Sequence, residues 1–297
     1  MNAMLVSAFL AFAAVVSGHG YVYRITADNT VYPGWDVAID PFTTPTPPRI
    51  AFGGGGVASV NDFEGPYIAC NFVHSPPPGA IAEVRAGSTI TFHWSQWLYS
   101  HKGPITAWMA PYSGSVADVN VNDLEFIKFA EDTIDKDGAW GTVRMMDQTN
   151  GSWTATIPAD IKPGTYVVRQ EIIALHFAVT KSPGFEMFPT GPQSYHACFN
   201  FNVTGTGTAT PQGVKFPGAY KLDEPGFHFD LSSNKSYPTV GPPLYKSQYE
   251  VKLEPKPRVV INPTDKGPEA DAAYYQTQSQ VLLNQATLVS YFDSIGG

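Results

Sequence analysis

Short runs of apolar and β-branched residues recur along most of the chain, and each is bounded by Gly, Pro, Asn or Asp. This pattern is typical of β-strands joined by turns and loops. Few long helical periods precede residue 268 and no internal repeat is found, so the sequence predicts an all-β antiparallel sandwich with long loops and few short helices. The segments expected to be strands are Thr89–Trp94, Ile105–Met109, Ser152–Ile157, Gly164–Ile173 and Ala197–Val203.

The chain begins with an apolar segment over residues 1–18. Its hydrophobic run, Met4–Val16, is shorter than the roughly 20 residues that span a bilayer. Val16 and Gly18 are small enough for a signal-peptidase site, although no Lys or Arg lies near the start. We therefore expect a signal peptide, the alternative being a buried N-terminal helix. Cleavage after Gly18 would make His19 the first residue of a secreted, extracellular protein.

The composition changes from Lys246 onward. Residues 247–268 are charged and contain proline, which suggests a linker or an arm wrapped over the surface. Residues 269–293 could form a helix or a partly disordered tail. The tail holds no cysteine, so a disulfide-stapled carbohydrate-binding module is not expected there. The predicted organisation is a signal peptide at 1–18, one domain at 19–246 and a C-terminal extension at 247–297.

The charge of the chain narrows the classes of partner. Charged residues make up 15% of the sequence and the net charge is −8, with 43% hydrophobic residues. This composition favours a folded protein over a disordered one. It provides no basic surface for nucleic acid and suits a neutral polysaccharide better than a polyanion. We expect a monomer with no nucleic-acid or membrane partner.

Two further features agree with secretion. Cys70 and Cys198 are the only cysteines, so one intramolecular disulfide is available, and its long loop would contribute about 5 kcal/mol in the chain-entropy model. Two separate buried thiols are the alternative. Three Asn-X-Ser/Thr sequences, at Asn150, Asn202 and Asn234, are candidate glycosylation sites and support secretion weakly because such sequences arise by chance.

A histidine at a mature N-terminus has a chemistry that an internal histidine lacks. Its α-amine and its own imidazole Nδ1 can chelate one metal ion, and a second imidazole completes a planar set of three nitrogens. Such a set selects Cu(II) through both geometry and affinity. The amine has a pKa of about 8, so copper can displace its proton near neutral pH. Position alone is weak support, because the terminal histidine could be incidental.

The sequence around these residues resembles one family, the fungal lytic polysaccharide monooxygenases of auxiliary activity family nine. The resemblance covers about residues 19–246, and its strength lies in several motifs that occur together in the family's order. The matching segments are His19–Val22, Tyr67–Asn71, Ser100–Pro104, Arg169–His176, Gln193–Cys198, Pro217–Tyr220 and Pro225–Phe227.

The resemblance implies an immunoglobulin-like or fibronectin-like β-sandwich that binds one copper ion per chain. His19 and His101 would be the equatorial ligands of a histidine brace, with Tyr195 near the axial position. His176 and Gln193 would supply hydrogen bonds where oxygen is activated, so His176, Gln193 and Tyr195 are the expected catalytic residues. Cys70 and Cys198 would form the disulfide.

Each of these roles has a simpler rival. His101 could be a surface loop residue, His176 a satisfied core histidine, Tyr195 core packing and Gln193 a loop cap. The joint occurrence of all four in the family's order favours the functional interpretation. His196 departs from the family pattern, which usually has proline there.

The implied reaction is oxidative cleavage of a β-1,4-glucan such as cellulose, or of xyloglucan or another hemicellulose, at the anomeric carbon or carbon 4. It requires dioxygen or hydrogen peroxide and an external electron donor. Tyr237 resembles a substrate-facing tyrosine of the family, and Tyr21, Tyr23 and Tyr245 are weaker candidates, with packing at least as probable for all four. The alternatives are a non-catalytic histidine-brace copper protein, a two-carboxylate hydrolase and a carbohydrate-binding module.

Overall fold

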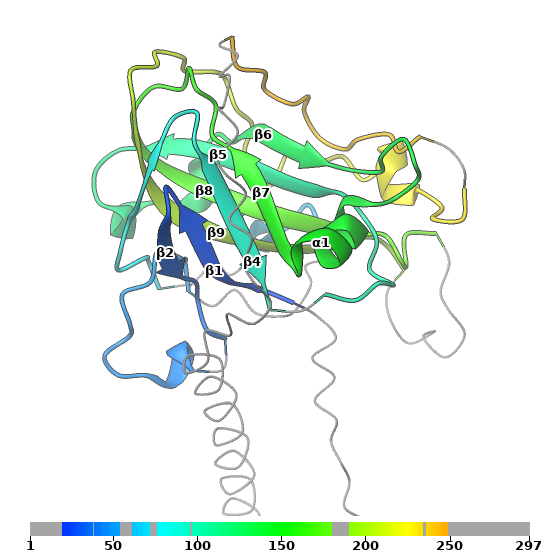
Figure 1. Cartoon of the computed structure of the whole chain (residues 1–297), viewed down its shortest axis with the longest axis horizontal. Helices are drawn as coiled ribbons and strands as arrows, with labels where there is room; N and C mark the ends of the chain where they lie inside the picture. Colours follow the sequence, from blue (N-terminus) through cyan, green and yellow to red (C-terminus); the bar gives the residue numbers. More distant parts are fainter. Residues whose placement is uncertain are drawn as a thin grey trace, which may run out of the picture.

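The structure is a computed structural model of the chain, and it describes residues 20–37, 39–53, 61–71, 76–95, 97–179, 190–233 and 236–248. Within these residues two sheets pack face to face as a β-sandwich, which confirms the predicted fold class (Figure 1). The strands are β1 Val22–Ala27, β2 Thr30–Pro33, β3 Ala82–Arg85, β4 Thr89–Trp94, β5 Ile105–Tyr112, β6 Ile127–Asp132, β7 Ser152–Thr156, β8 Gly164–Ala174 and β9 Gln193–Thr204.

The smaller sheet has the order β2-β1-β4-β7, and its neighbouring strands are antiparallel. Burial alternates along β4, where Ile90, Phe92 and Trp94 are buried and the residues between them are half-buried. An alternating strand of this kind packs one face on the core and turns the other towards solvent. The smaller sheet therefore supplies one side of the core.

The larger sheet has the order β3-β9-β8-β5-β6 and is covered on both faces. Its centre is the long antiparallel pair of β8 and β9, in register from Gly164↔Val203 to Ala174↔Gln193. Val168 and Ile172 of β8 face the smaller sheet, whereas Val167 and Ile173 face an outer layer of loops. Two-sided burial explains why β8 is buried almost throughout, including the polar residues Arg169, Gln170 and Glu171 at its centre.

The outer layer consists of loop segments around residues 63–70 and 216–240. A disulfide between Cys70 and Cys198 ties the first of these segments to β9, with the two Cα atoms 5.3 Å apart. The predicted disulfide is thereby confirmed. Because Cys198 lies in the middle of β9, the bridge fixes the loop layer directly to the central strands.

One α-helix, α1 (Gly141–Thr149), lies at the end of the sandwich and was not predicted from the sequence. It ends where Asn150 adopts a left-handed conformation, with φ of 48°, and Gly151 follows. The other helices in the described segments are short 3-10 turns: η1 Asp40–Phe42, η2 Pro66–Ile68, η3 Val116–Asp118, η4 Val121–Asp123 and η5 Pro225–His228. The prediction of few short helices is confirmed for this part of the chain.

Both chain ends lie outside the described residues. This applies to the predicted signal peptide at 1–18, to His19 and to the helix expected at 269–293. Among the helices that the structure describes, none combines the length and the apolar character needed to cross a bilayer.

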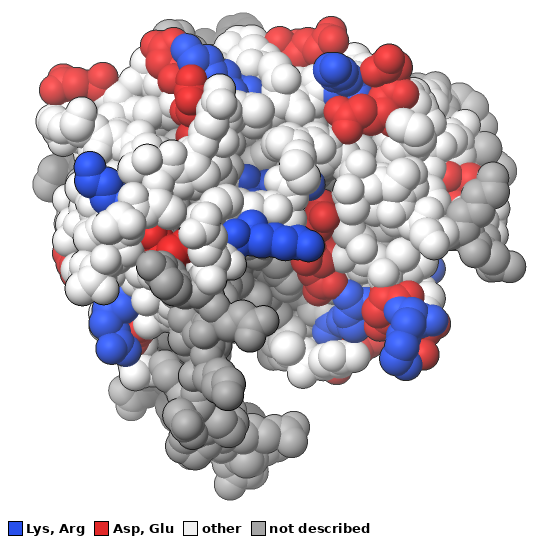
Figure 2. Space-filling view, turned by 90° about the horizontal axis from the view of Figure 1, so that it is seen from above, with Lys and Arg blue, Asp and Glu red and all other residues white. Residues whose placement is uncertain are grey.

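The surface carries charges of both signs. On the face shown in Figure 2, Lys and Arg side chains are interspersed with Asp and Glu, and most of the described surface is uncharged. A surface of this kind agrees with the predicted preference for a neutral partner.

Candidate functional site

His101 lies in the loop between β4 and β5. Backbone hydrogen bonds join this loop to the end of β8. The Leu175 amide donates to the Lys102 carbonyl at 2.9 Å, and the Ile173 amide donates to the Pro104 carbonyl at 3.1 Å. Gly103 allows this close approach, because a Cβ at that position would lie 1.8 Å from the Ile173 carbonyl oxygen. The loop thereby holds His101 beside His176, which is the second residue after the end of β8.

The imidazole rings of His101 and His176 are in direct contact. Their centroids are 3.8 Å apart and their planes differ by 26°, which is a stacked arrangement. Only 7% of the surface of His101 is exposed. Trp97 packs edge-on against both His101 and Tyr195, and its indole N–H donates to the His101 carbonyl at 3.0 Å. The His101 ring is therefore confined on several sides.

Gln193 and Tyr195 come from the start of β9, opposite the end of β8. In the register of this pair, Gln193 faces Ala174 and Tyr195 faces Ile172. The two side chains lie on the same face of β9, as residues two apart in a strand must. The Tyr195 hydroxyl donates to Gln193 Oε1 at 2.8 Å, and the Tyr195 and His101 rings are 6.1 Å apart.

The chain that follows position 19 runs along the same site. The Tyr21 carbonyl accepts a hydrogen bond from the Ser95 amide at 2.9 Å, and the Tyr21 amide donates to Ser95 Oγ at 3.2 Å. Gly20 and Tyr21 also line a small cavity together with Tyr195 and Trp94. The first described residues of the domain are thus anchored next to the aromatic cluster that confines His101.

Conventional metal sites built from three or more side chains are not found in the described part of the chain, when His, Cys, Asp and Glu are considered. A metal bound at this loop would therefore take one imidazole, that of His101, and complete its ligand set elsewhere. Copper held partly by backbone nitrogen meets this condition.

Comparison with known proteins identifies the family. The model of Auxiliary Activity family 9 (formerly GH61) matches residues 19–239. The chain belongs to auxiliary activity family 9. A family 9 lytic polysaccharide monooxygenase A from Geotrichum candidum is 37% identical over 80% of this chain and 80% of its own length. A family 9 lytic polysaccharide monooxygenase B from Gloeophyllum trabeum is 38% identical over 80% of this chain and 95% of its own.

Solved structures agree with this assignment to family 9. The glycoside hydrolase family 61 member Cel61B from Hypocrea jecorina superposes with a TM-score of 0.69 and 29% identity, covering 76% of this chain and all of its own. A cellulose-active polysaccharide monooxygenase from M. thermophila gives a TM-score of 0.64 and 28% identity, covering 77% of this chain and 99% of its own. As a member of family 9, this chain is a lytic polysaccharide monooxygenase.

The structure brings together four of the residues proposed from the sequence of this family 9 member, namely His101, His176, Gln193 and Tyr195. Tyr237 is placed differently. It is only 7% exposed and lies edge-on to Trp140 and Phe229 within the outer core cluster. The sugar contact stays a prediction, and the buried ring favours the alternative that Tyr237 serves in packing.

The candidate glycosylation sites also differ in their surroundings. Asn150 is exposed at the end of α1. Asn202 is half-buried in β9 and donates hydrogen bonds to both carboxylate oxygens of Glu83. Asn234 lies outside the described residues. Of the two described asparagines, Asn150 is the better placed for modification.

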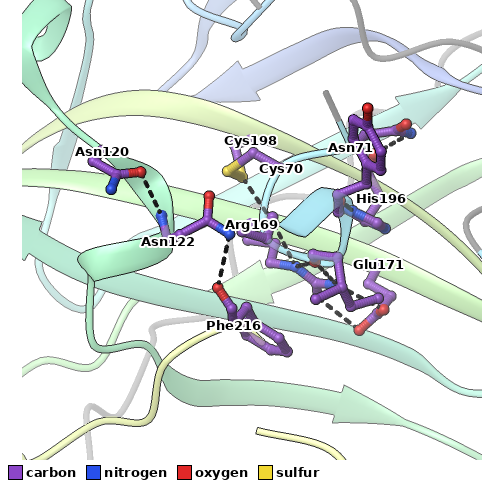
Figure 3. Close-up of a disulfide and its surroundings, with 12 residues drawn as sticks. Cys70, Asn71, Asn120, Asn122, Arg169, Glu171, His196, Cys198 and Phe216 are labelled. Atoms are coloured by element: carbon purple, nitrogen blue, oxygen red, sulfur yellow. Dashed lines mark hydrogen bonds and ion pairs between the residues drawn. A yellow bond between two sulfur atoms is a disulfide. The ribbon is translucent and has the colours of Figure 1, made fainter. Parts of the chain in front are cut away.

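A buried ionic network lies on the opposite face of β8 and β9 from Gln193 and Tyr195 (Figure 3). Arg169 and Glu171 pair with both side chains fully buried, and Arg169 also donates to the Ala69 carbonyl at 2.9 Å. Ser194 and Tyr220 both donate to the Glu171 carboxylate. Burial alone would raise the pKa of Glu171, but the paired Arg169 lowers it to about 2.

His196, which departs from the family pattern, belongs to this network. Its Nε2 is 2.9 Å from the Tyr67 carbonyl oxygen, and its Nδ1 is 2.7 Å from Ser194 Oγ. Burial, followed by the charge of Arg169, lowers the pKa of His196 to about 3, so the ring is neutral. From the sequence, Arg169–His176 is recognisable only as a family segment, because strand periodicity does not show that Arg169 and Glu171 form a buried pair.

Proposed function

We propose that this family 9 member is a secreted, copper-dependent enzyme that oxidatively cleaves β-1,4-glucan, with His19 and His101 as the equatorial metal ligands. The observation that carries the proposal is the cluster formed by His101, His176, Gln193 and Tyr195, which come from three separate segments and converge at one end of the sandwich. The match to the family model begins at residue 19, which supports His19 as the mature N-terminus.

The donor set suits a histidine brace. Ser100 Oγ lies 3.0 Å from His101 Nδ1, so Nε2 of the same ring would be the nitrogen left for the metal. The anchoring of Tyr21 to Ser95 brings the start of the domain to the same loop region. An N-terminal histidine would add its amine and imidazole, giving three nitrogen donors. Bound copper would supply the one-electron chemistry that activates dioxygen or hydrogen peroxide, with electrons from an external donor.

Gln193 and Tyr195 would act as a coupled pair. Because the Tyr195 hydroxyl donates to Gln193 Oε1, the amide nitrogen of Gln193 is left as the donor of that side chain. The amide N–H groups can then stabilise negative charge that develops on oxygen near the metal. The hydrogen bond also orients the Tyr195 ring, which is packed against Trp97 and would shield the axial position.

His176 would complete the oxygen-handling set. Its ring stacks on the His101 ring and also contacts the Phe177 ring. The centroids of the His176 and Phe177 rings are 4.3 Å apart. This packing would hold the ring nitrogens of His176 close to His101, the proposed metal ligand. His176 would therefore hold or deliver a hydrogen bond at a defined position, which is the requirement for a group that acts on a reacting oxygen.

Mass spectrometry of soluble products tests the proposal. We expect oxidised oligosaccharides from cellulose, and a comparison with xyloglucan and xylan would define the glucan and whether the anomeric carbon or carbon 4 is attacked. Products should require ascorbate or another reductant, and His101→Ala should abolish them. His228→Ala is the matched control, because His228 is exposed and its ring is hydrogen-bonded to the Leu222 carbonyl oxygen. Unchanged oxidised products from His101→Ala would refute the proposal.

A further inference from the structure

The surface beside the copper-ligating loop is hollowed. A shallow depression of about 590 Å³, open to solvent, begins at Ser100 and Lys102, the two chain neighbours of His101. Its other side is formed by α1 and by Leu231 of the outer loop layer. The hollow therefore adjoins the site where the reaction takes place, and a molecule bound in it would be attached close to the reacting bond.

An exposed tyrosine forms one wall of this hollow. Tyr99 is 59% exposed, and its hydroxyl donates to Asp147 Oδ1 of α1 at 2.6 Å. Because this hydrogen bond joins the loop of Tyr99 to α1, it restricts the Tyr99 ring to one orientation.

The rest of the hollow combines apolar and polar groups. Trp140 is buried beneath it, and Val143 and Leu231 are half-buried around it. Lys102 and Asp147 are exposed at the rim and carry opposite charges. An aromatic wall, an apolar floor and a few polar groups are the features that bind a neutral pyranose, whose ring has apolar C–H faces and hydroxyl edges.

We propose that this hollow is a subsite for a branch sugar of a substituted β-1,4-glucan, with Tyr99 as the residue that stacks on it. The proposal rests on the polysaccharide-cleaving function proposed above and goes beyond it by naming the substrate class. A flat crystalline face cannot fill a depression, whereas a sugar that projects from a soluble backbone can enter it. Tyr237, the first candidate for contact with a flat sugar face, is buried, whereas Tyr99 is exposed.

Binding of two soluble oligosaccharides tests the proposal. A xyloglucan oligosaccharide and an unbranched cello-oligosaccharide of the same backbone length are titrated into the copper-loaded protein by calorimetry, without reductant. Wild type should bind the branched ligand more tightly. Tyr99→Ala should raise the Kd of the branched ligand about tenfold, or about 1.4 kcal/mol, and that of the unbranched one by less than about twofold. Asp147→Asn, which keeps the side-chain shape, should give a smaller loss in the same direction.

The matched control is Tyr67→Ala, because Tyr67 is also an exposed tyrosine, at 46%, but does not line the hollow. It should change neither Kd. Equal wild-type affinity for the two ligands, or an equal loss for both in Tyr99→Ala, would overturn the branch subsite. A wild type that releases no oxidised product from any glucan would instead overturn the proposed function, while the binding difference would still report on the hollow.

Discussion

The substitution Glu171→Gln tests how much the buried ion pair at the centre of the larger sheet contributes to stability. Arg169 Nη1 and Nη2 donate to the two oxygens of Glu171 at 2.6 and 2.7 Å, and both side chains are fully buried. Glutamine has nearly the same shape as glutamate but no charge. The variant would therefore leave the guanidinium of Arg169 in the core without its counter-ion, and only carbonyl acceptors such as Ala69 would remain.

The expected loss in the free energy of unfolding follows from the burial of both charges. Removing one partner of a fully buried pair destabilises a protein by about 3–5 kcal/mol, because the remaining charge is uncompensated. Arg169 keeps its hydrogen bonds to the Ile68 and Ala69 carbonyls, so we expect a loss near 3 kcal/mol, at the low end of this range. In a domain of this size such a loss lowers the Tm by about 10 °C. Arg169→Met combined with Glu171→Gln removes both charges and should restore most of the stability.

Equilibrium urea denaturation with the disulfide intact measures the effect. The matched control is Asp137→Asn, which breaks the pair of Lys136 and Asp137, whose side chains are 86% and 72% exposed. This exposed pair should contribute less than about 1 kcal/mol. A Glu171→Gln variant as stable as wild type, or a double variant no more stable than Glu171→Gln alone, would refute the reasoning.

Three further predictions follow from individual contacts. Burial, followed by the charge of Arg24, lowers the pKa of His93 from 6.5 to about 4, so stability that is complete above pH 6.5 is lost as the pH falls towards 4. His93→Gln should flatten the dependence of urea stability on pH in this window, and an unchanged slope would contradict the assignment. Gly103→Ala should displace the His101 loop, because the added Cβ collides with the backbone of β8, and calorimetry should show Cu(II) affinity reduced at least about tenfold; wild-type affinity would show that the loop adjusts freely. Replacing Cys70 and Cys198 together by serine should lower the free energy of unfolding by about 2–5 kcal/mol, and a loss below about 1 kcal/mol would show that the bridge is dispensable.

Local patterns predicted the strands where burial alternates or runs apolar without interruption. Thr89–Trp94 is predicted and observed with the same bounds, because its inward residues contrast with their neighbours. β9 is longer than predicted and begins at Gln193 instead of Ala197. Its first residues include Ser194 and His196, which look like loop residues but are buried because the outer loop layer covers that face. A second covering layer is a tertiary feature that strand periodicity does not reveal.

The candidate site could be assembled from family motifs, but its surroundings could not. The segments with His101, His176 and Tyr195 were recognisable because they occur together in the family's order, and the structure shows that they converge. The exposure of Tyr99 and the burial of Tyr237 depend instead on how α1 and the outer loops pack. These loops are rich in Pro and Gly and carry no period, so their packing follows from long-range contacts that a single sequence does not encode locally.

The central claim is that a histidine binds copper through its own backbone amine together with the imidazole of His101. The most direct measurement is calorimetric Cu(II) affinity of two forms of the protein that both begin at His19, one with a free terminal amine and one with that amine acetylated. Acetylation converts the amine of His19 into an amide and adds no new terminal amine that could chelate copper together with the imidazole. The account predicts tight binding of one equivalent of copper by the first form and affinity lower by at least about a hundredfold in the second. Equal affinity of the two forms would contradict the account.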